Sequence, residues 1–214
     1  MPRERKGIVQ RKSHTLDGRS FFIIASEGSK TERTYFQGLK KIAKPKIEIE
    51  ILERNSTASS PEHVIQQLDV YVKEYVLVEG DELWILIDRD SQSWSIKQIN
   101  EIAKCCFQKK YFLALSNPCF EIWLLLHVKD ISEYSGEEKN KIFENKKINK
   151  SRTAIEKELL DILGSYNKSN LDVEAFILHV DIAIKRAKKL DISPGARWIN
   201  DLGTRVHLLV EKLI

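Results

Sequence analysis

Hydrophobic residues form four short runs along the chain, separated by stretches in which they recur at helical spacing. The runs cover residues 21–25, 47–51, 83–87 and 111–115. Three of them are continuously apolar, which is typical of strands buried on both faces of a parallel sheet. In the second run isoleucine alternates with glutamate, which indicates a half-exposed strand. Helix start signals lie between the runs, namely a capping box at residues 29–32 and a serine–proline pair at residues 60–61.

The alternation of strands and helices predicts an α/β fold. We expect a mostly parallel four-stranded sheet that is flanked by helices on both faces. After Asp130 no further strand is predicted, and the polar stretch 139–151 is typical of a loop or lid. Helical patterns cover residues 156–163, 173–190 and 204–213. The expected organisation is a basic N-terminal arm (1–19), an α/β core (20–130) and a helical C-terminal portion packed on the core (131–214).

The composition is that of a soluble globular protein, with 42% hydrophobic and 31% charged residues. The longest apolar run, residues 122–126, is too short to span a bilayer, and no apolar segment follows the charged N-terminus as in a signal peptide. The three cysteines, Cys105, Cys106 and Cys119, form no CxxC pair, so neither a disulfide framework nor a zinc site is expected. These features predict a cytoplasmic protein without a membrane role.

The net charge of +4 is concentrated in the first 20 residues, which hold six basic and two acidic side chains. Such an arm can hold a phosphate backbone. The residues predicted to contact nucleic acid in this way are Arg3, Arg5, Lys6, Arg11 and Lys12. The alternative is an exposed terminus without a ligand. A second basic excess, over residues 139–157, is interpreted as a solvated helix face.

Acidic residues follow three of the predicted strands. Glu27 follows the first, Asp88 and Asp90 follow the third, and Glu121 lies shortly after the fourth. Carboxyl ends of parallel strands meet at one edge of the sheet, where ligands gather, so we expect these carboxylates to lie together. Crowded anions raise each other's pKa unless a cation lies among them, and oxygen ligands without a histidine or cysteine cluster favour Mg²⁺ or Mn²⁺.

Each of these acids also fits an ordinary structural role. An Asp-x-Asp pair commonly caps the next helix, and Glu27 beside Gly28 is compatible with a simple loop. Glu32 is interpreted as a capping-box partner rather than a ligand, and Glu121 lies where an acid favours the helix dipole. Only the combination of acidic residues at the ends of three strands favours a divalent-metal site.

A phosphate-binding segment is predicted at the start of the first helix, which opens with Ser29, Lys30 and Thr31 after Gly28. Free N–H groups at a helix N-terminus bind anions, and Lys30 adds a positive charge. The segment lacks the P-loop spacing, and the chain has no Gly-x-Gly-x-x-Gly. Neither an NTPase nor a dinucleotide site is therefore predicted.

Three blocks of the sequence resemble a known family. They are residues 27–32 followed by Tyr35-Phe36, the pair Asp88-x-Asp90, and residues 116–127, which read Ser-Asn-Pro-Cys-Phe-Glu-Ile-Trp-Leu-Leu-Leu-His. An acid after the first strand with Asp-x-Asp after the third resembles Toprim domains, found in topoisomerases, primases and OLD-family nucleases. The full set is similar to the RloB-like (AbiLii-like) family. The resemblance covers residues 20–130 well and continues more thinly toward the C-terminus.

The resemblance implies a function and a partner. RloB-like proteins are linked with bacterial anti-phage defence and abortive infection, and are commonly encoded beside an ABC/AAA-type ATPase. The similar OLD-family nucleases hold Mg²⁺ with Toprim carboxylates and cut phosphodiesters. By position, Glu27, Asp88 and Asp90 match the metal-binding acids. Glu27 is alternatively a general acid or base, as proposed for some Toprim enzymes.

The remaining assignments by resemblance concern three residues. Glu121 matches an acid specific to RloB-like proteins and completes the expected catalytic set with Glu27, Asp88 and Asp90. Either Lys30 or Arg89 would steady the phosphate. This chain has no ATPase domain of its own, so a trigger has to come from a partner.

Three functional hypotheses follow. The first is a Mg²⁺- or Mn²⁺-dependent nuclease that cuts DNA or RNA as the effector of a defence system with an ATPase partner. The second is a regulatory or adaptor subunit whose Toprim-like site binds metal or nucleotide without catalysis. The third is a hydrolase of a small phosphate ester, which shares the acids and does not need the basic arm.

Overall fold

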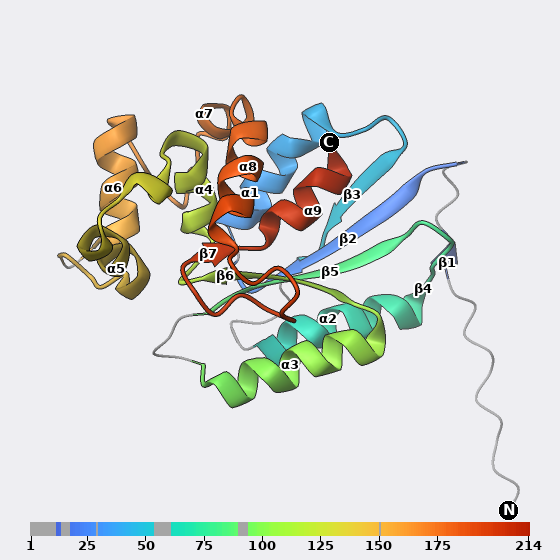
Figure 1. Ribbon diagram of the computed structural model, residues 1–214. Coiled ribbons are helices and arrows are strands. Elements are labelled where there is room, and N and C mark those ends of the chain that lie inside the picture. Colours follow the sequence, from blue (N-terminus) through green and yellow to red (C-terminus); the bar gives the residue numbers. More distant parts are fainter. Residues whose placement is uncertain (1–11, 14–17, 29, 54–60, 90–93, 150) are drawn as a thin grey trace, which may run out of the picture.

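The computed structural model describes residues 12–13, 18–28, 30–53, 61–89, 94–149 and 151–214. Its centre is a five-stranded sheet with the order β3-β2-β5-β6-β7 (Figure 1). The strands are β2 (Ser20–Ser26), β3 (Ile47–Ile51), β5 (Glu82–Asp88), β6 (Phe112–Asn117) and β7 (Gly203–Thr204). The first four run parallel, and β7 pairs antiparallel with β6. The α/β class with a mostly parallel sheet is therefore confirmed.

The continuously apolar strands are buried on both faces, because alternate residues enter two separate apolar clusters. Phe22, Ile24 and Trp84 belong to one cluster, whereas Ile23 and Ile85 belong to the other. One face is covered by α2 (Pro61–Glu74) and α3 (Ile96–Lys109). The opposite face is covered by α1 (Thr31–Leu39), α4 (Glu121–Val128), α8 (Val180–Leu190) and α9 (Val206–Leu213) (Figure 1).

The helices after Asp130 extend the second of these layers. They include η2 (Ile131–Glu133), α5 (Gly136–Glu144), α6 (Ala154–Leu163) and α7 (Glu174–Ile177). Ile142 of α5 and Ile155 of α6 belong to the same apolar cluster as α1 and α4. The helical C-terminal portion therefore packs on the α/β core. No described helix has the length and apolar character that a membrane span requires.

The structure differs from the sequence-based expectation at three places after Asp130. The prediction of no further strand is wrong, because Gly203 and Thr204 form β7 against β6. Two residues are too few to show a strand pattern. The polar stretch is helical as far as Glu144, since Ser135 caps α5 and its capping box is completed by Glu138. The helix predicted over residues 173–190 is divided into α7 and α8.

Two further short strands were not predicted, namely β1 (Lys12–Ser13) and β4 (Tyr75–Val76). The helical pattern that begins in α1 continues into η1 (Lys40–Ile42), which is a short 3-10 turn. Strand β1 pairs parallel with β4 in a separate two-stranded sheet. Since β4 comes shortly before β5, this small sheet lies at the amino-terminal end of the central strands (Figure 1).

The strand order creates a switch point at the centre of the sheet. Strands β2 and β5 are neighbours, but the chain continues from β2 to β3 on one side and from β5 to β6 on the other. In open α/β sheets the loops that leave such a point open a crevice at the carboxyl ends of the strands, where ligands bind. Glu27 directly follows β2 and Asp88 ends β5, so the fold places these two acids at the crevice.

Candidate functional site

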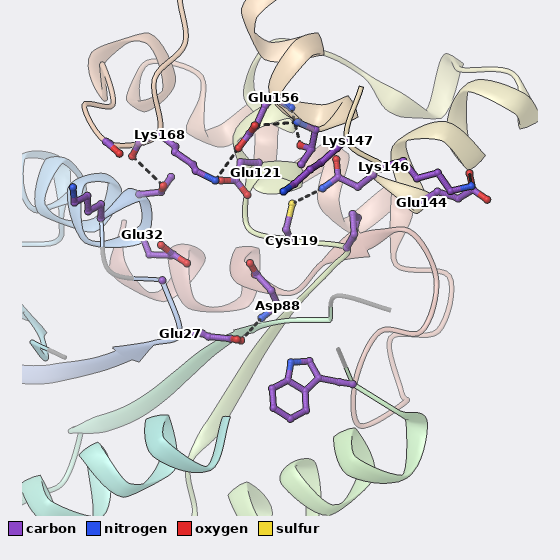
Figure 2. A pocket seen from close by; sticks show the side chains of 18 residues that line it. Glu27, Glu32, Asp88, Cys119, Glu121, Glu144, Lys146, Lys147, Glu156 and Lys168 are labelled. Atoms are coloured by element: carbon purple, nitrogen blue, oxygen red, sulfur yellow. Dashed lines mark hydrogen bonds and ion pairs between the residues drawn. The ribbon is translucent and has the colours of Figure 1, made fainter. Parts of the chain in front are cut away.

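A cavity of about 920 Å³ lies at the carboxyl edge of the sheet, between the strand ends and the α5–α6 region (Figure 2). Its lining combines five acidic residues around the sheet edge and the helix starts with lysines from three separate segments. The acids are Glu27, Glu32, Asp88, Glu121 and Glu156, and the lysines are Lys30, Lys146, Lys147 and Lys168. Glu144, Cys119 and Trp94 also line it.

Glu27 and Asp88 meet where β2 and β5 end. The backbone N–H of Glu27 donates to the carbonyl of Leu86 at 3.0 Å, which extends the β2–β5 pairing by one residue. In the opposite direction, the backbone N–H of Asp88 donates to Oε2 of Glu27 at 3.4 Å. Figure 2 shows both carboxylates at the floor of the cavity. The two predicted acids are therefore brought together by the sheet itself.

Glu32 is a third acid of this floor, although the sequence favoured a capping role for it. Helix α1 begins at Thr31, its N-cap is Lys30, and the Lys30 side chain makes no cap hydrogen bond. The Glu32 carboxylate instead lies over Gly28, where a Cβ would be only 2.0 Å from either oxygen. A side chain at position 28 would therefore displace this buried carboxylate.

Glu121 joins the site from the other side. It is the first residue of α4 and is half-buried in the lining of the cavity. The next five residues of the helix, 122–126, are fully buried, so the apolar core fixes the position from which this carboxylate projects. Cys119, two residues earlier, accepts a hydrogen bond at Sγ from Nδ2 of Asn145 at 3.4 Å.

The acids perturb one another. Burial is the largest cause, and together with the charges of Glu121 and Glu27 it raises the pKa of Glu32 to about 7. Burial also raises the pKa of Asp88 well above its ordinary value, with added repulsion from Glu32, Glu121 and Glu27. Burial, followed by the charge of Glu121, likewise raises the pKa of the Cys119 thiol. Such a crowd of carboxyl groups is stabilised by a cation among them.

The lysines face these acids from the helical portion. Lys168 Nζ lies 2.9 Å from Oε1 of the buried Glu156, and the Lys168 carbonyl accepts a hydrogen bond from Oγ1 of Thr31 at 3.1 Å. Lys146 Nζ lies 2.9 Å from Oε2 of the exposed Glu144. Glu27, Glu32 and Asp88 are together called the acidic floor from here on, and Lys146, Lys147 and Lys168 the lysine wall (Figure 2).

Arg89 does not enter the cavity. It is buried beside Trp198, with the guanidinium carbon 5.1 Å from the ring centroid, and its Nη1 donates to the carbonyl of Asn200 at 2.7 Å. Asn117 Nδ2 donates to the same carbonyl at 2.7 Å. The structure therefore uses Arg89 to hold the segment before β7 against the sheet and gives no support to a phosphate-binding role.

The basic arm is described only at its end. Lys12 lies in β1, with its ammonium nitrogen 5.5 Å from the ring centroid of Tyr75, at the end of the sheet opposite to the acidic floor. Arg3, Arg5, Lys6 and Arg11 lie outside the described residues, as do Ser29 and Asp90. Lys30 and Thr31 line the cavity as expected.

The donor set suits a hard divalent cation. The floor offers carboxylate oxygens, the ligands that Mg²⁺ and Mn²⁺ prefer, and the described part of the cavity contains no histidine. Among the described residues no three acidic, histidine or cysteine side chains are already gathered as a ligand group. Glu27 and Asp88 are the residues that would hold an ion, with Asp90 as a predicted ligand outside the described residues.

Sequence reasoning missed the lysine wall, Glu156 and Trp94. The only signal was the basic excess over residues 139–157, which was interpreted as a solvated helix face. Lys146 and Lys147 belong to it, and both are exposed to solvent. Their position in the cavity depends on the packing of α5 and α6 onto α4, which no local pattern reveals.

Comparison with known proteins gives one match that covers nearly the whole chain. A protein-family model described as "RloB-like protein" matches residues 22–213. The match includes both the α/β core and the helical C-terminal portion. Searches among curated proteins and among solved structures gave no match.

Proposed function

The chain belongs to the RloB-like family, and from this premise we propose that it is a metal-dependent nuclease that hydrolyses phosphodiester bonds of DNA or RNA. The observation that carries the proposal is the meeting of Glu27, Asp88 and Glu32 at the switch point of the sheet, opposite a row of lysines. Carboxylates that hold a divalent cation beside cations that hold phosphate are the two requirements of metal-assisted phosphodiester hydrolysis.

The roles of the residues follow from their positions. Glu27 and Asp88 would hold the cation, with Asp90 as the expected third ligand. Lys30, at the start of α1, neutralises a non-bridging phosphate oxygen together with free N–H groups of the helix. Glu121 projects from the rigid α4 and orients the attacking water. A bound Mg²⁺ or Mn²⁺ supplies Lewis-acid polarisation of the phosphoryl group and lowers the pKa of water.

We further propose that the nuclease acts in bacterial anti-phage defence, as an effector that an ABC/AAA-type ATPase triggers. The support is the family membership, together with the resemblance of the strand-end acids to Toprim nucleases. A non-catalytic adaptor subunit that binds metal or nucleotide is the competing hypothesis.

The test is cleavage of plasmid DNA and of total RNA by the purified protein with Mg²⁺ or Mn²⁺. Asp88→Asn keeps the shape of the side chain and removes its charge. It is expected to lower the cleavage rate about a thousandfold, because metal catalysis lowers the activation barrier by several kcal/mol. Asp161→Asn is the matched control, because Asp161 pairs with Lys157 on an exposed part of α6 outside the cavity. It is expected to cut at the wild-type rate.

Three outcomes separate the hypotheses. Metal-dependent cutting that requires Asp88 supports the nuclease, and the degraded pool identifies its substrate. Cutting that is equal in both variants contradicts the proposed site. If neither pool is cut, the assay is repeated with the neighbouring ATPase and ATP, and continued inactivity favours the adaptor.

A further inference from the structure

The lysine wall is a built part of the cavity rather than a loose surface. Asn145 ends α5 in the left-handed conformation, its Oδ1 accepts from the Ile155 N–H at 3.0 Å, and its Nδ2 donates to Cys119 at the cavity floor. The backbone of the next residues is held as well. The Ala154 N–H donates to the Lys146 carbonyl at 3.1 Å, and Lys147 forms an isolated antiparallel β-bridge with Thr153. The backbone that carries Lys146 and Lys147 is therefore fixed at both sides.

The third lysine is held from two other elements. Thr31 at the start of α1 bonds the Lys168 carbonyl, and Arg152 Nη1 donates to the nearby Tyr166 carbonyl at 3.1 Å. The Lys168 side chain lies against Glu156 at the start of α6. Segments that are far apart in the chain thus converge on one side of the cavity, with the Lys168 ammonium group beside Glu156 and that of Lys146 beside Glu144 (Figure 2).

The charges of the wall remain largely available to a ligand. Lys147 forms no ion pair with any described residue, and the partner of Lys146 is Glu144, whose side chain is 43% exposed. An ion pair between exposed side chains contributes little, so a phosphate competes with it readily. Only Lys168 has a buried partner.

The size of the cavity restricts what can reach the floor. Its volume of about 920 Å³ is at the upper end of pockets that enclose one small ligand, roughly 300–1,000 Å³. Glu32 is only 6% exposed, so the floor is recessed below the wall. The phosphates of a duplex lie on the outside of a broad, stiff cylinder that fits poorly over a recessed floor, whereas a flexible single strand can bend into it.

Trp94 adds a feature that single strands use. It lines the cavity shortly before the start of α3 and is half-buried. Proteins that bind single strands combine a cationic groove with aromatic rings on which bases stack, each stack contributing about 1–3 kcal/mol.

We propose that the lysine wall holds the backbone of a single-stranded nucleic acid, or of a strand pulled out of its pairing, so that one phosphodiester reaches the acidic floor. The inference rests on the proposed nuclease function and names its substrate class. The contacts to Lys146, Lys147 and Lys168 are with phosphate, so they carry no preference for base sequence.

The experiment measures binding separately from cleavage. Fluorescence anisotropy of labelled oligo(dT), of oligo(U) and of the oligo(dT)·oligo(dA) duplex is recorded with the full chain carrying Asp88→Asn, which prevents cutting. Lys146→Gln/Lys147→Gln is compared in this background with Lys188→Gln/Lys189→Gln. The second pair is a matched control, because these adjacent lysines are exposed on α8 and pair with Glu211 and Asp130 outside the cavity.

We expect the Lys146→Gln/Lys147→Gln variant to lose much of its affinity for the oligonucleotides and the control variant to lose none. Each phosphate contact to a single strand contributes a slope of about −0.7 in log K against log salt, so two lost contacts weaken binding roughly 25-fold at 0.1 M salt and flatten the slope by about 1.4. Single strands are expected to bind more tightly than the duplex. The comparison of oligo(dT) with oligo(U) shows whether the protein prefers a deoxyribose or a ribose strand.

Three results overturn the inference: equal binding by both double variants, binding of the duplex as tight as that of single strands, or no binding of any probe. Melting temperatures of the variants show that a loss is not caused by unfolding. Cleavage by the same lysine variants with Asp88 intact separates the two proposals. If the wall variant cuts at the wild-type rate, the nuclease proposal is supported and the role of the wall is contradicted. If binding depends on the wall but no protein cuts, the role of the wall is supported and the nuclease proposal is contradicted.

Discussion

The two sides of the cavity are built in different ways. The acidic floor lies on two strand ends and on the first turn of α1, with Glu121 beside it on the first turn of α4, and the next residues of both helices enter the apolar core. The lysine wall lies on connections between helices and is held by backbone and side-chain hydrogen bonds, with its lysine side chains exposed. The stability of the fold is therefore expected to depend on the residues that support the floor and little on the lysines of the wall.

The largest effect that tests this difference is on folding stability. Trp123 of α4 is fully buried and packs edge-on against Tyr35 of α1, with ring centroids 6.2 Å apart. Trp123→Ala is expected to lower the free energy of unfolding by about 3–5 kcal/mol, because it leaves a cavity beneath the floor. Lys146→Ala is expected to change it by less than about 0.5 kcal/mol. Urea unfolding measures both, and similar losses would show that wall and floor are equally coupled to the core.

The second effect concerns metal. If Glu27 and Asp88 hold Mg²⁺ or Mn²⁺, the ion stabilises the folded state by about 2.7 kcal/mol when its concentration is a hundred times its Kd. The melting temperature of the wild type should therefore rise with added metal, and that of Asp88→Asn should not. Lys146→Gln/Lys147→Gln is expected to respond like the wild type, since the wall offers no oxygen ligand. An equal rise in Asp88→Asn would place the ion elsewhere.

The third effect concerns pH and the support of the floor. His127 of α4 is buried, its Nδ1–H donates to the Trp123 carbonyl at 2.8 Å, and its Nε2 accepts from the Tyr35 hydroxyl at 3.0 Å. This pairing links α1 to α4 and requires the neutral ring. Burial, which is the main cause, lowers the pKa of His127 from its ordinary 6.5 to about 3.

The unfolded chain protonates His127 near pH 6.5, whereas the folded protein does so only near pH 3. The free energy of unfolding is therefore highest above pH 6.5 and falls as the pH is lowered from 6.5 toward 3. The loss between pH 7 and pH 5 is about 2 kcal/mol. Because the raised pKa values of Glu32 and Asp88 act in the opposite direction, the measurement is the difference in unfolding free energy between the wild type and His127→Gln at each pH. A difference that does not change with pH would contradict the assignment of a neutral His127.

The smallest effect is on the wall alone. Glu144→Gln removes the exposed partner of Lys146 and is expected to leave stability within about 0.5 kcal/mol. It should nevertheless tighten binding of oligo(dT) severalfold, because one negative charge at the cavity is lost. Glu174→Gln, which removes the partner of Lys41 on a distant surface, is the control. Equal affinities of the two variants would indicate that Lys146 does not contact the strand.

The sequence predicted the floor better than the wall for a physical reason. Glu27 and Asp88 follow apolar strands, and parallel strands necessarily end at one edge, so local patterns were sufficient to bring them together. Glu32 was predicted as the capping-box partner of Ser29, which lies outside the described residues, and the structure places its carboxylate over Gly28. Arg89 follows Asp88 directly and therefore points to another side, where it bonds Asn200.

The wall depends on tertiary packing. Lys147 and Lys168 are separated in the chain by the whole of α6, and they reach one cavity only because α6 packs against α4. Strand β7 was missed for a similar reason, since Gly203 and Thr204 are defined by their pairing with Asn117 and Ser116. Features that depend on distant contacts leave little trace in a local pattern.

The complete burial of residues 122–126 also has a consequence for the dynamics of the site. A helix enclosed by protein on all sides has no low-energy way to open locally, so its amide hydrogens exchange with solvent only when the entire fold opens. The amides of α4 should therefore be among the slowest to exchange. The backbone of Glu121 is therefore expected to keep its position, and under the proposed function the adjustment to an incoming strand would be made by the side chains of the lysine wall.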